Sequence, residues 1–447
     1  MRPLIVPLPL ALLLTAALTA PAGAARILTV PVDYATIDEA LDHARVGDEV
    51  VLTSGTYLET QLRMRPGVIL RGETGDPADV ILDGQGVGPI LFCLDIEERI
   101  GVHGITFRNG AGATGGAVDL RLRRGMDMSA CVFEGNSSAS QGGALSVIQV
   151  NDMDTENCIF TDLVFRDNTA ELDGGGAVVV FAPVLFQNCE FLNNHCGRDG
   201  GGLFVPSHNT VLLECLFQEN RADADGGAFD GNGRCRIELC TFRDNHADQS
   251  GGAVQIAESI TDCVFEGNSA GGAGGAVLLA AESTRSEFVG NEAGLFGGAI
   301  ASLNVGLDCL FRGNHAAYAG GAVSGARQLA RCVFEDNSAA KGGALELNIG
   351  PNDFEDCEFR NNSALLEGGA VYAWGYVDVS TFLRCRFTAN TAPAGPAGVY
   401  PAGQTCLLSC SLTDLADWEA EDLAVDDDEC NVANESMGFG QLKRAYR

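Results

Sequence analysis

The region around residue 374 places aromatic side chains at every second position. Tyr372, Trp374 and Tyr376 alternate with smaller residues. Neighbouring residues of a β-strand point to opposite faces, so the three rings are expected on one outward face. A repeat in the chain, described below, places Glu346 one unit before Tyr372 and Tyr400 one unit after it. Exposed rings beside a carboxylate can stack on sugar rings, so these five residues are ligand-binding candidates.

Cleavage of a polysaccharide would need reactive side chains close together. Glycoside hydrolases use two carboxylates roughly 5 to 9.5 Å apart, and lyases need a general base. One column to test is the outward residue that follows each G-G-A-[VLI] motif: Asp119, Ser146, Val179, Val205, Asp230, Gln255, Leu278, Ala301, Ser324, Glu346, Tyr372 and Tyr400. Its carboxylates are four and five units apart, about 19 and 24 Å at the spacing of β-strands. No catalytic pair is expected within this column.

The column that follows the phenylalanine of each unit alternates in charge. Arg243 stands beside Glu266, and Arg312, Glu335 and Arg360 follow one another on adjacent units. Solvated ion pairs between neighbouring strands explain this pattern better than a catalytic base does.

Acidic clusters are the candidates for a bound cation. Asp223 with Asp225, and Asp152 with Asp154, could bind calcium through carboxylate oxygens. Neither pair matches an EF-hand loop or a glycine-aspartate nonapeptide, so solvated turns are the first expectation. The sequence indicates no other cofactor, because it offers neither a C-x-x-C pair nor clustered histidines for zinc.

One repeat supplies the elements that position these residues. The segments C-x-F-x-x-N and G-G-A-[VLI], joined by a variable turn, recur eleven times. The asparagines stand 23 to 32 residues apart, at Asn136, Asn168, Asn194, Asn220, Asn245, Asn268, Asn291, Asn314, Asn337, Asn362 and Asn390. A period of this length, with alternating apolar residues and no helical pattern, predicts an all-β fold, a parallel β-helix solenoid.

Each repeated residue has an expected structural role. We expect the asparagines to take left-handed turn conformations and to stack as a hydrogen-bonded ladder at one corner. The Gly-Gly pair is expected to form the next corner, and the phenylalanines to stack through the core.

The cysteines follow the same repeat. Ten of the 16, Cys158 among them, are assigned to the C-x-F position, and Ser286 takes that position in the remaining unit. We favour buried thiols over disulfides because Ser286 and an unbroken column suit packing better than pairing. Cys406, Cys410 and Cys430 are better disulfide candidates, although sequence alone does not give their pairing.

The chain divides into four parts. Residues 1–25 predict a secretory signal peptide, because their apolar run ends in a small-residue cleavage site and is too short to span a membrane. Residues 26–110 are expected to hold an N-terminal capping helix, with a capping box at Thr36, and irregular first coils. Residues 111–402 hold the regular coils, and 403–447 form an irregular C-terminal cap and tail.

The C-terminal cap offers an alternative for the aromatic patch. Trp418 lies in this segment, and a cap folded over the last coils would cover Tyr372 and its neighbours. Covered aromatic rings would be packing residues and not a ligand-binding surface.

Composition and charge limit the partners. Hydrophobic residues make up 46% of the 447 residues, which supports a large core, and 60 acidic residues against 28 basic ones give a net charge of -32. Such a chain repels a phosphate backbone, so nucleic acid is not an expected partner. Beyond the signal peptide no stretch is long and apolar enough to cross a bilayer, which predicts a secreted or cell-surface protein without a transmembrane segment.

Two segments resemble known families. Residues 33–57 resemble the opening of pectin-lyase-like right-handed β-helix proteins. The F-x-x-N and G-G-A-[ILV] units, from about residue 107 to residue 399, resemble the repeats of the polymorphic outer-membrane protein family of bacterial surface adhesins. The resemblance implies a right-handed helix but is weak for function, because this coil carries lyases, hydrolases, adhesins and inert surface proteins.

The residues and the resemblance together favour a non-catalytic binding or adhesion rod, with a polysaccharide or a surface protein as its partner. A polysaccharide lyase or glycoside hydrolase is the second hypothesis. A purely structural surface protein is the third.

Overall fold

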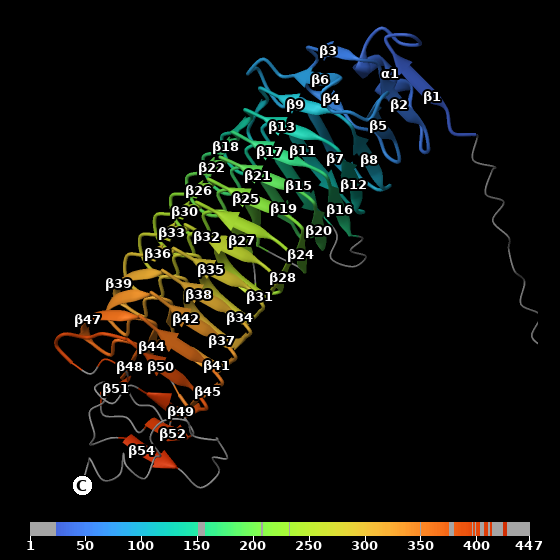
Figure 1. The fold of residues 1–447 in the computed structure, drawn as a ribbon. Helices are drawn as coiled ribbons and strands as arrows, with labels where there is room; N and C mark the ends of the chain where they lie inside the picture. The colour runs from blue at the N-terminus through green and yellow to red at the C-terminus, as the bar shows by residue number, and fades with distance from the viewer. Residues whose placement is uncertain are drawn as a thin grey trace, which may run out of the picture.

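The computed structural model describes residues 24–150, 157–206, 209–231, 233–348, 350–374, 380–395, 397, 399–402, 406–409, 412–413 and 423–426. These residues build an elongated rod of stacked coils, with about 14 turns (Figure 1). The rod begins with β1 (Ile27–Val30) and α1 (Ile37–His43), and the last described strand is β54 (Leu423–Asp426).

A regular coil contributes strands to three parallel sheets that run along the rod. In the described part of the chain, sheet A has 28 strands, sheet B has 15 and sheet C has 11. A typical coil consists of β31 (Val254–Thr261) in sheet A, β32 (Val264–Glu266) in sheet B and β33 (Ser269–Ala270) in sheet C. The next coil repeats it with β34 (Val277–Thr284), β35 (Glu287–Val289) and β36 (Glu292–Ala293). The predicted all-β parallel β-helix is therefore confirmed.

Phenylalanine rings form a continuous stack inside the rod. Successive ring centroids lie 4.6 to 5.2 Å apart, with interplanar angles of at most 10°. The stack consists of Phe107, Phe133, Phe165, Phe191, Phe217, Phe242, Phe265, Phe288, Phe311, Phe334, Phe359 and Phe387. Equivalent residues of neighbouring coils pair in register, as Phe265 does with Phe288, so each ring lies over the next.

The repeated asparagines are buried and bonded from coil to coil. The backbone N–H and the side-chain Nδ2 of Asn268 both donate to Oδ1 of Asn291 at 3.0 Å, and Nδ2 also donates to the carbonyl of Phe242. The same contacts recur along the ladder from Asn136 to Asn390. The coils are thus joined by side-chain as well as backbone hydrogen bonds.

The left-handed turn that we expected at each asparagine lies one residue earlier. Asp244 and Gly267, which precede Asn245 and Asn268, have φ values of 53° and 65°. The asparagine side chain is committed to the neighbouring coils, and the residue before it makes the turn.

The Gly-Gly pair forms a corner that other residues cannot. Gly274 has a φ of +68°, and a Cβ atom on Gly275 would lie 2.1 Å from the carbonyl oxygen of Gly298 in the next coil. The first glycine supplies the left-handed turn and the second permits close approach of two backbones.

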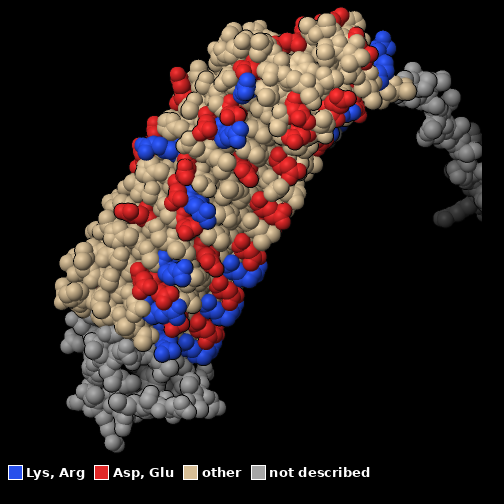
Figure 2. Space-filling model, turned by 45° about the horizontal axis from the view of Figure 1, so that its top comes forward, with Lys and Arg blue, Asp and Glu red and all other residues tan. Residues whose placement is uncertain are grey.

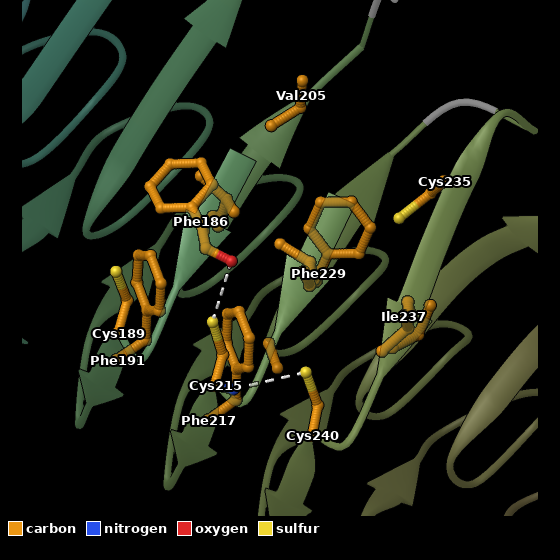
Figure 3. Close-up of a cluster of buried hydrophobic side chains, with 14 of the residues drawn as sticks. Phe186, Cys189, Phe191, Val205, Cys215, Phe217, Phe229, Cys235, Ile237 and Cys240 are labelled. Carbon is orange, nitrogen blue, oxygen red and sulfur yellow. Dashed lines mark hydrogen bonds between the residues drawn. The ribbon is translucent and has the colours of Figure 1, made fainter. Parts of the chain in front are cut away.

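Nine of the ten cysteines assigned to the C-x-F position form the expected buried column, and the described cysteines from Cys93 to Cys385 are free thiols. The disulfide candidates Cys406, Cys410 and Cys430 have no described side chains. Figure 3 shows Cys189, Cys215 and Cys240 beside the phenylalanine stack, with the backbone N–H of Cys215 donating to Sγ of Cys240. The assignment of Cys158 is wrong. Cys158 lies on β16 (Cys158–Thr161) of sheet A, and Leu163 takes the column position because Phe165, two residues later, stacks on Phe133.

A third left-handed corner carries a ladder of opposite charges. Asp262, Arg285, Asp308, Arg331, Asp356 and Arg384 occupy it on six successive coils, all with positive φ. Each arginine donates two hydrogen bonds of 2.6 to 2.8 Å to the aspartate of the preceding coil. Basic and acidic side chains also alternate over the C-terminal coils in Figure 2.

The N-terminal helix lies at the end of the rod where the chain begins (Figure 1). Thr36 is its N-cap and accepts a hydrogen bond from the backbone N–H of Glu39 at 3.2 Å. Ile37, Ala40 and Leu41 are buried in the main core cluster. Among the described residues no helix has the length and apolar character of a membrane span. The signal-peptide prediction falls mainly on residues 1–23, outside the described residues.

Candidate functional site

The aromatic candidates lie on the last regular coils. Tyr372 and Trp374 belong to β48 (Val371–Trp374), and the backbone of Tyr400 on β51 (Val399–Ala402) pairs with that of Tyr372. The side chain of Trp374 is 44% exposed, whereas Tyr372 is only 9% exposed. Tyr376 lies outside the described residues, as does Trp418 of the expected cap.

Trp374 is held by a buried carboxylate. Its indole Nε1 donates a hydrogen bond to Glu346, which lies on β44 (Leu345–Leu347) and is 1% exposed. Glu346 also accepts a hydrogen bond from the hydroxyl of Ser324 on β40 (Val323–Ser324). An exposed indole with a fixed orientation results.

Tyr372 is covered by a lysine and does not form part of an open patch. The ammonium of Lys341 donates to the Tyr372 hydroxyl at 3.2 Å and lies 4.6 Å from the ring centroid. Lys341 also pairs with Glu367 at 3.3 Å. Its pKa is raised, first by the hydrogen bond to Tyr372. Of the two described rings of β48, Trp374 is therefore the one open to solvent.

The outer column of sheet A is more buried than expected. Ser146, Asp230, Ser324 and Glu346 are at most 6% exposed. The reason is the Gly-Gly turn, which folds over the column: a Cβ atom on Gly226 would lie 2.9 Å from Cβ of Asp230.

Two members of that column were misassigned. Ser146 pairs with Val178, not Val179, and Val178 pairs with Phe204, not Val205. These coils have three consecutive glycines, and the third glycine stands where other coils have alanine. Counting from the last two glycines shifts the column by one residue.

A carboxylate cluster lies across the Gly-Gly turn and joins residues of different columns, so the prediction made from one column alone did not include it. Asp225 and Asp230 flank Gly226 and Gly227, and Asp199 precedes the same turn one coil earlier. The backbone N–H of Asp225 donates to Asp199 at 3.2 Å. The sequence did contain a signal, since Asp-Gly-Gly occurs on three successive coils at residues 173, 199 and 225.

Burial and the neighbouring charges raise the pKa values of two carboxyl groups in this cluster. Burial, followed by the charges of Asp199, Asp225 and Asp173, raises the pKa of Asp230 to about 8. Burial also raises the pKa of Asp199. Arg198 lies nearby and donates two hydrogen bonds to Asp173, one of them at 2.6 Å, while its Nε lies 3.5 Å from Asp199.

The calcium candidates are not brought together. Asp223 pairs with His195 at 3.0 Å and with Arg221 at 3.4 Å, and the bond from His195 is the main reason its pKa is lowered. Asp225 instead accepts a hydrogen bond from Gln255 at 3.1 Å. Asp152 and Asp154 lie outside the described residues. In the described part of the chain, no group of three or more His, Cys, Asp or Glu residues has metal-site geometry.

An open hollow of about 760 Å³ lies over the first strands of sheet C. Small side chains line most of it, including Ala111, Ser137 and Thr169, with Glu171 and His195 as its charged or titratable members. It brings together none of the residues singled out from the sequence.

Two family models match the chain. Residues 97–293 match the right-handed β-helix region, and residues 356–373 match the Chlamydia polymorphic membrane protein repeat. No curated protein matches the chain.

Several solved structures show a distant similarity to this chain. The catalytic domain of Agl-KA is 13% identical with a TM-score of 0.41, covering 87% of this chain and 69% of that one. The PL6 polysaccharide lyase Pedsa3628 from Pseudopedobacter saltans is 12% identical with a TM-score of 0.34, covering 87% and 92%. The catalytic domain of a GH87 α-1,3-glucanase in complex with nigerose is 10% identical with a TM-score of 0.34, covering 90% and 68%. With identities this low and TM-scores below 0.5, the activities of these proteins are not transferred to this chain.

Proposed function

Because the chain is a right-handed parallel β-helix repeat protein with a polymorphic membrane protein repeat, we propose that it is a secreted or cell-surface binding rod. The proposed ligand is a polysaccharide, bound without catalysis at Trp374. The observation that carries the proposal is the exposed indole fixed by the buried carboxylate of Glu346. A ring held in one orientation loses little conformational entropy when a sugar stacks on it.

The test uses residues 26–447 and a panel of acidic and neutral polysaccharides, each with and without calcium. Pull-down measures binding, and the release of reducing ends and unsaturated products measures cleavage. We expect Trp374→Ala to weaken binding of the retained polymer at least tenfold, because the stacking surface is removed.

Two further variants make the test specific. Trp374→Phe keeps a ring but loses the hydrogen bond to Glu346, so we expect an intermediate affinity. Tyr318→Ala removes an aromatic side chain that is 49% exposed elsewhere on the rod, and it should bind as the unchanged protein does. Turnover of any polymer would favour a lyase or hydrolase instead. Absence of both turnover and binding would leave protein adhesion or a structural role.

A further inference from the structure

The carboxylate of Asp173 binds the guanidinium of Arg198 within the rod. The side chain of Asp173 is fully buried. Arg198 donates from Nε to its Oδ1 at 2.6 Å and from the terminal nitrogen to its Oδ2, and Gln141 donates to Oδ2 at 2.7 Å. The guanidinium thus reaches from its own coil to the aspartate of the preceding coil. Such two-point pairing is what a planar guanidinium offers to a carboxylate.

The next coil repeats the carboxylates without the arginine. Asp199 stands one coil after Asp173, and Asp225 one coil after Asp199, with the N–H of Asp225 donating to Asp199. The position equivalent to Arg198 is Ala224, whose N–H donates to the carbonyl of Arg198 at 2.9 Å. Ala224 is uncharged, so Asp199 lacks the two-point arginine contact that Asp173 has, and its ion pair is with Nε of Arg198 at 3.5 Å.

Asp230 adds a further carboxyl to this place from a different element. It lies on β27 (Phe229–Gly231), is 6% exposed, and pairs in register with Phe204. No hydrogen-bond donor reaches its carboxyl within the described ranges. A Cβ atom on Gly226, the neighbour of Asp225, would lie 2.9 Å from Cβ of Asp230, and Gln255, which follows Asp230 in the outer column, donates to Asp225 at 3.1 Å. Burial, followed by the charges of Asp199 and Asp225, raises the pKa of Asp230. A buried carboxyl without a donor is costly, and a cation placed beside it would relieve that cost.

We propose that Asp199, Asp225 and Asp230, here called the acidic notch, bind the guanidinium group of an arginine side chain on a partner protein. The geometry of Arg198 on Asp173 is the internal template for this contact. The half-buried Phe204 in register with Asp230 offers an aromatic surface on which a guanidinium can stack. The inference is independent of sugar binding at Trp374, because the two sites are six coils apart, about 29 Å at the strand spacing.

The direct probe is the peptide acetyl-Gly-Arg-Gly-amide, titrated into residues 26–447 at low salt and followed by calorimetry. The same peptide with citrulline has nearly the same shape but no charge, and we expect it to bind at least tenfold more weakly. The lysine peptide should fall between them, because an ammonium cannot form the two-point contact. Equal binding of the arginine and citrulline peptides would overturn the proposal.

An arginine introduced into the chain next to the acidic notch should compete directly with the peptide. Ala224→Arg places a guanidinium where Arg198 stands in the preceding coil, so it should occupy the acidic notch and reduce peptide affinity at least tenfold. The matched control is Leu295→Arg, because Leu295 belongs to the same column and is 50% exposed but lies beside Ala273, which is uncharged. Similar peptide affinity in both variants would contradict the assignment of the site.

Removal of one carboxyl and a change of pH complete the test. Asp230→Asn should weaken the arginine peptide at least tenfold, whereas Asp248→Asn, which alters an exposed aspartate paired with Arg221, should not. The groups that face Asp230 are Asp173, Asp199, Asp225 and Arg198. Since a guanidinium favours the ionised carboxylate, peptide affinity should rise with pH through about 8 in the unchanged protein and stay flat in Asp230→Asn. Calcium binding that disappears in Asp230→Asn, with no binding of the arginine peptide, would replace the guanidinium by a metal ion.

Discussion

The interior positions of the coils repeat the same residues, whereas the outer positions of the same coils vary. Inside, Phe265 stacks on a phenylalanine in each neighbouring coil, and Asn268 bonds to an asparagine in each. Outside, the column on sheet A changes from Phe204 to Asp230, and later from Ser324 to Glu346. Identical interior residues hold the coils in register, which frees the outer column to vary. The positions that depart from the repeat are therefore the places to look for binding.

The largest effect is expected from breaking an interior stack. Phe265→Ala removes a ring that lies 4.7 Å from Phe242 and 4.9 Å from Phe288, and it leaves a cavity in a fully buried column. We expect a loss of about 3–5 kcal/mol in the free energy of unfolding. Denaturant unfolding followed by circular dichroism measures it, with Tyr318→Ala on the surface as the control. A loss equal to that of Tyr318→Ala would show that the stack does not hold the coils together.

A smaller effect, dependent on pH, is expected at the outer column. The folded-state pKa of Asp230, about 8, is above the value of an unfolded aspartate. The contribution of Asp230 to folding stability is therefore complete below about pH 4 and is lost as the pH rises to about 8. In this range the unfolded chain has released the Asp230 proton while the folded protein still holds it, so a rise in pH favours the unfolded state. Compared with the unchanged protein, Asp230→Asn should gain stability between pH 5 and pH 9.

Thermal unfolding midpoints of both proteins at pH 5 and pH 9 provide the measurement. The difference between the two midpoints should grow with pH. A difference independent of pH would mean that Asp230 is ionised in the folded protein at both values.

The smallest effect is expected at the charged corner. Arg331 makes two hydrogen bonds to Asp308, but both side chains are well exposed to solvent. Exposed ion pairs contribute little and are screened by salt, so Arg331→Ala should leave the unfolding midpoint almost unchanged in 1 M salt. A decrease comparable to that of Phe265→Ala would show that the six-coil ladder acts as a cooperative network.

The sequence predicted the repeating part of the molecule and failed where one coil departs from the others. The spacing of F-x-x-N predicted the coils. Phe165 and Asn168 align with the phenylalanines and asparagines of the neighbouring coils, and this alignment shows that Cys158 does not belong to the thiol column. Because two coils have three consecutive glycines, Val178 and Phe204 were not recognised as members of the outer column.

The candidate sites were less predictable because they depend on contacts between columns. The repeat brings Glu346 and Trp374 to neighbouring coils, but Lys341, which covers Tyr372, comes from a different sheet, on β43 (Ser338–Lys341). The approach of Asp230 to Asp225 requires the chain to reverse at Gly226 and Gly227, which a comparison of equivalent residues does not reveal.

The equal length of several coils has a consequence for how such a chain can evolve. Val254, Val277, Ile300 and Val323 pair in succession at intervals of 23 residues, so a whole unit can be duplicated or lost without disturbing the register on either side. Each such event would change the distance between Asp230 and Trp374 by one strand spacing, about 4.8 Å. Adding or removing whole units would therefore change the separation of surface residues on the rod only in whole strand spacings, and would leave the turns and the core of each remaining coil unchanged.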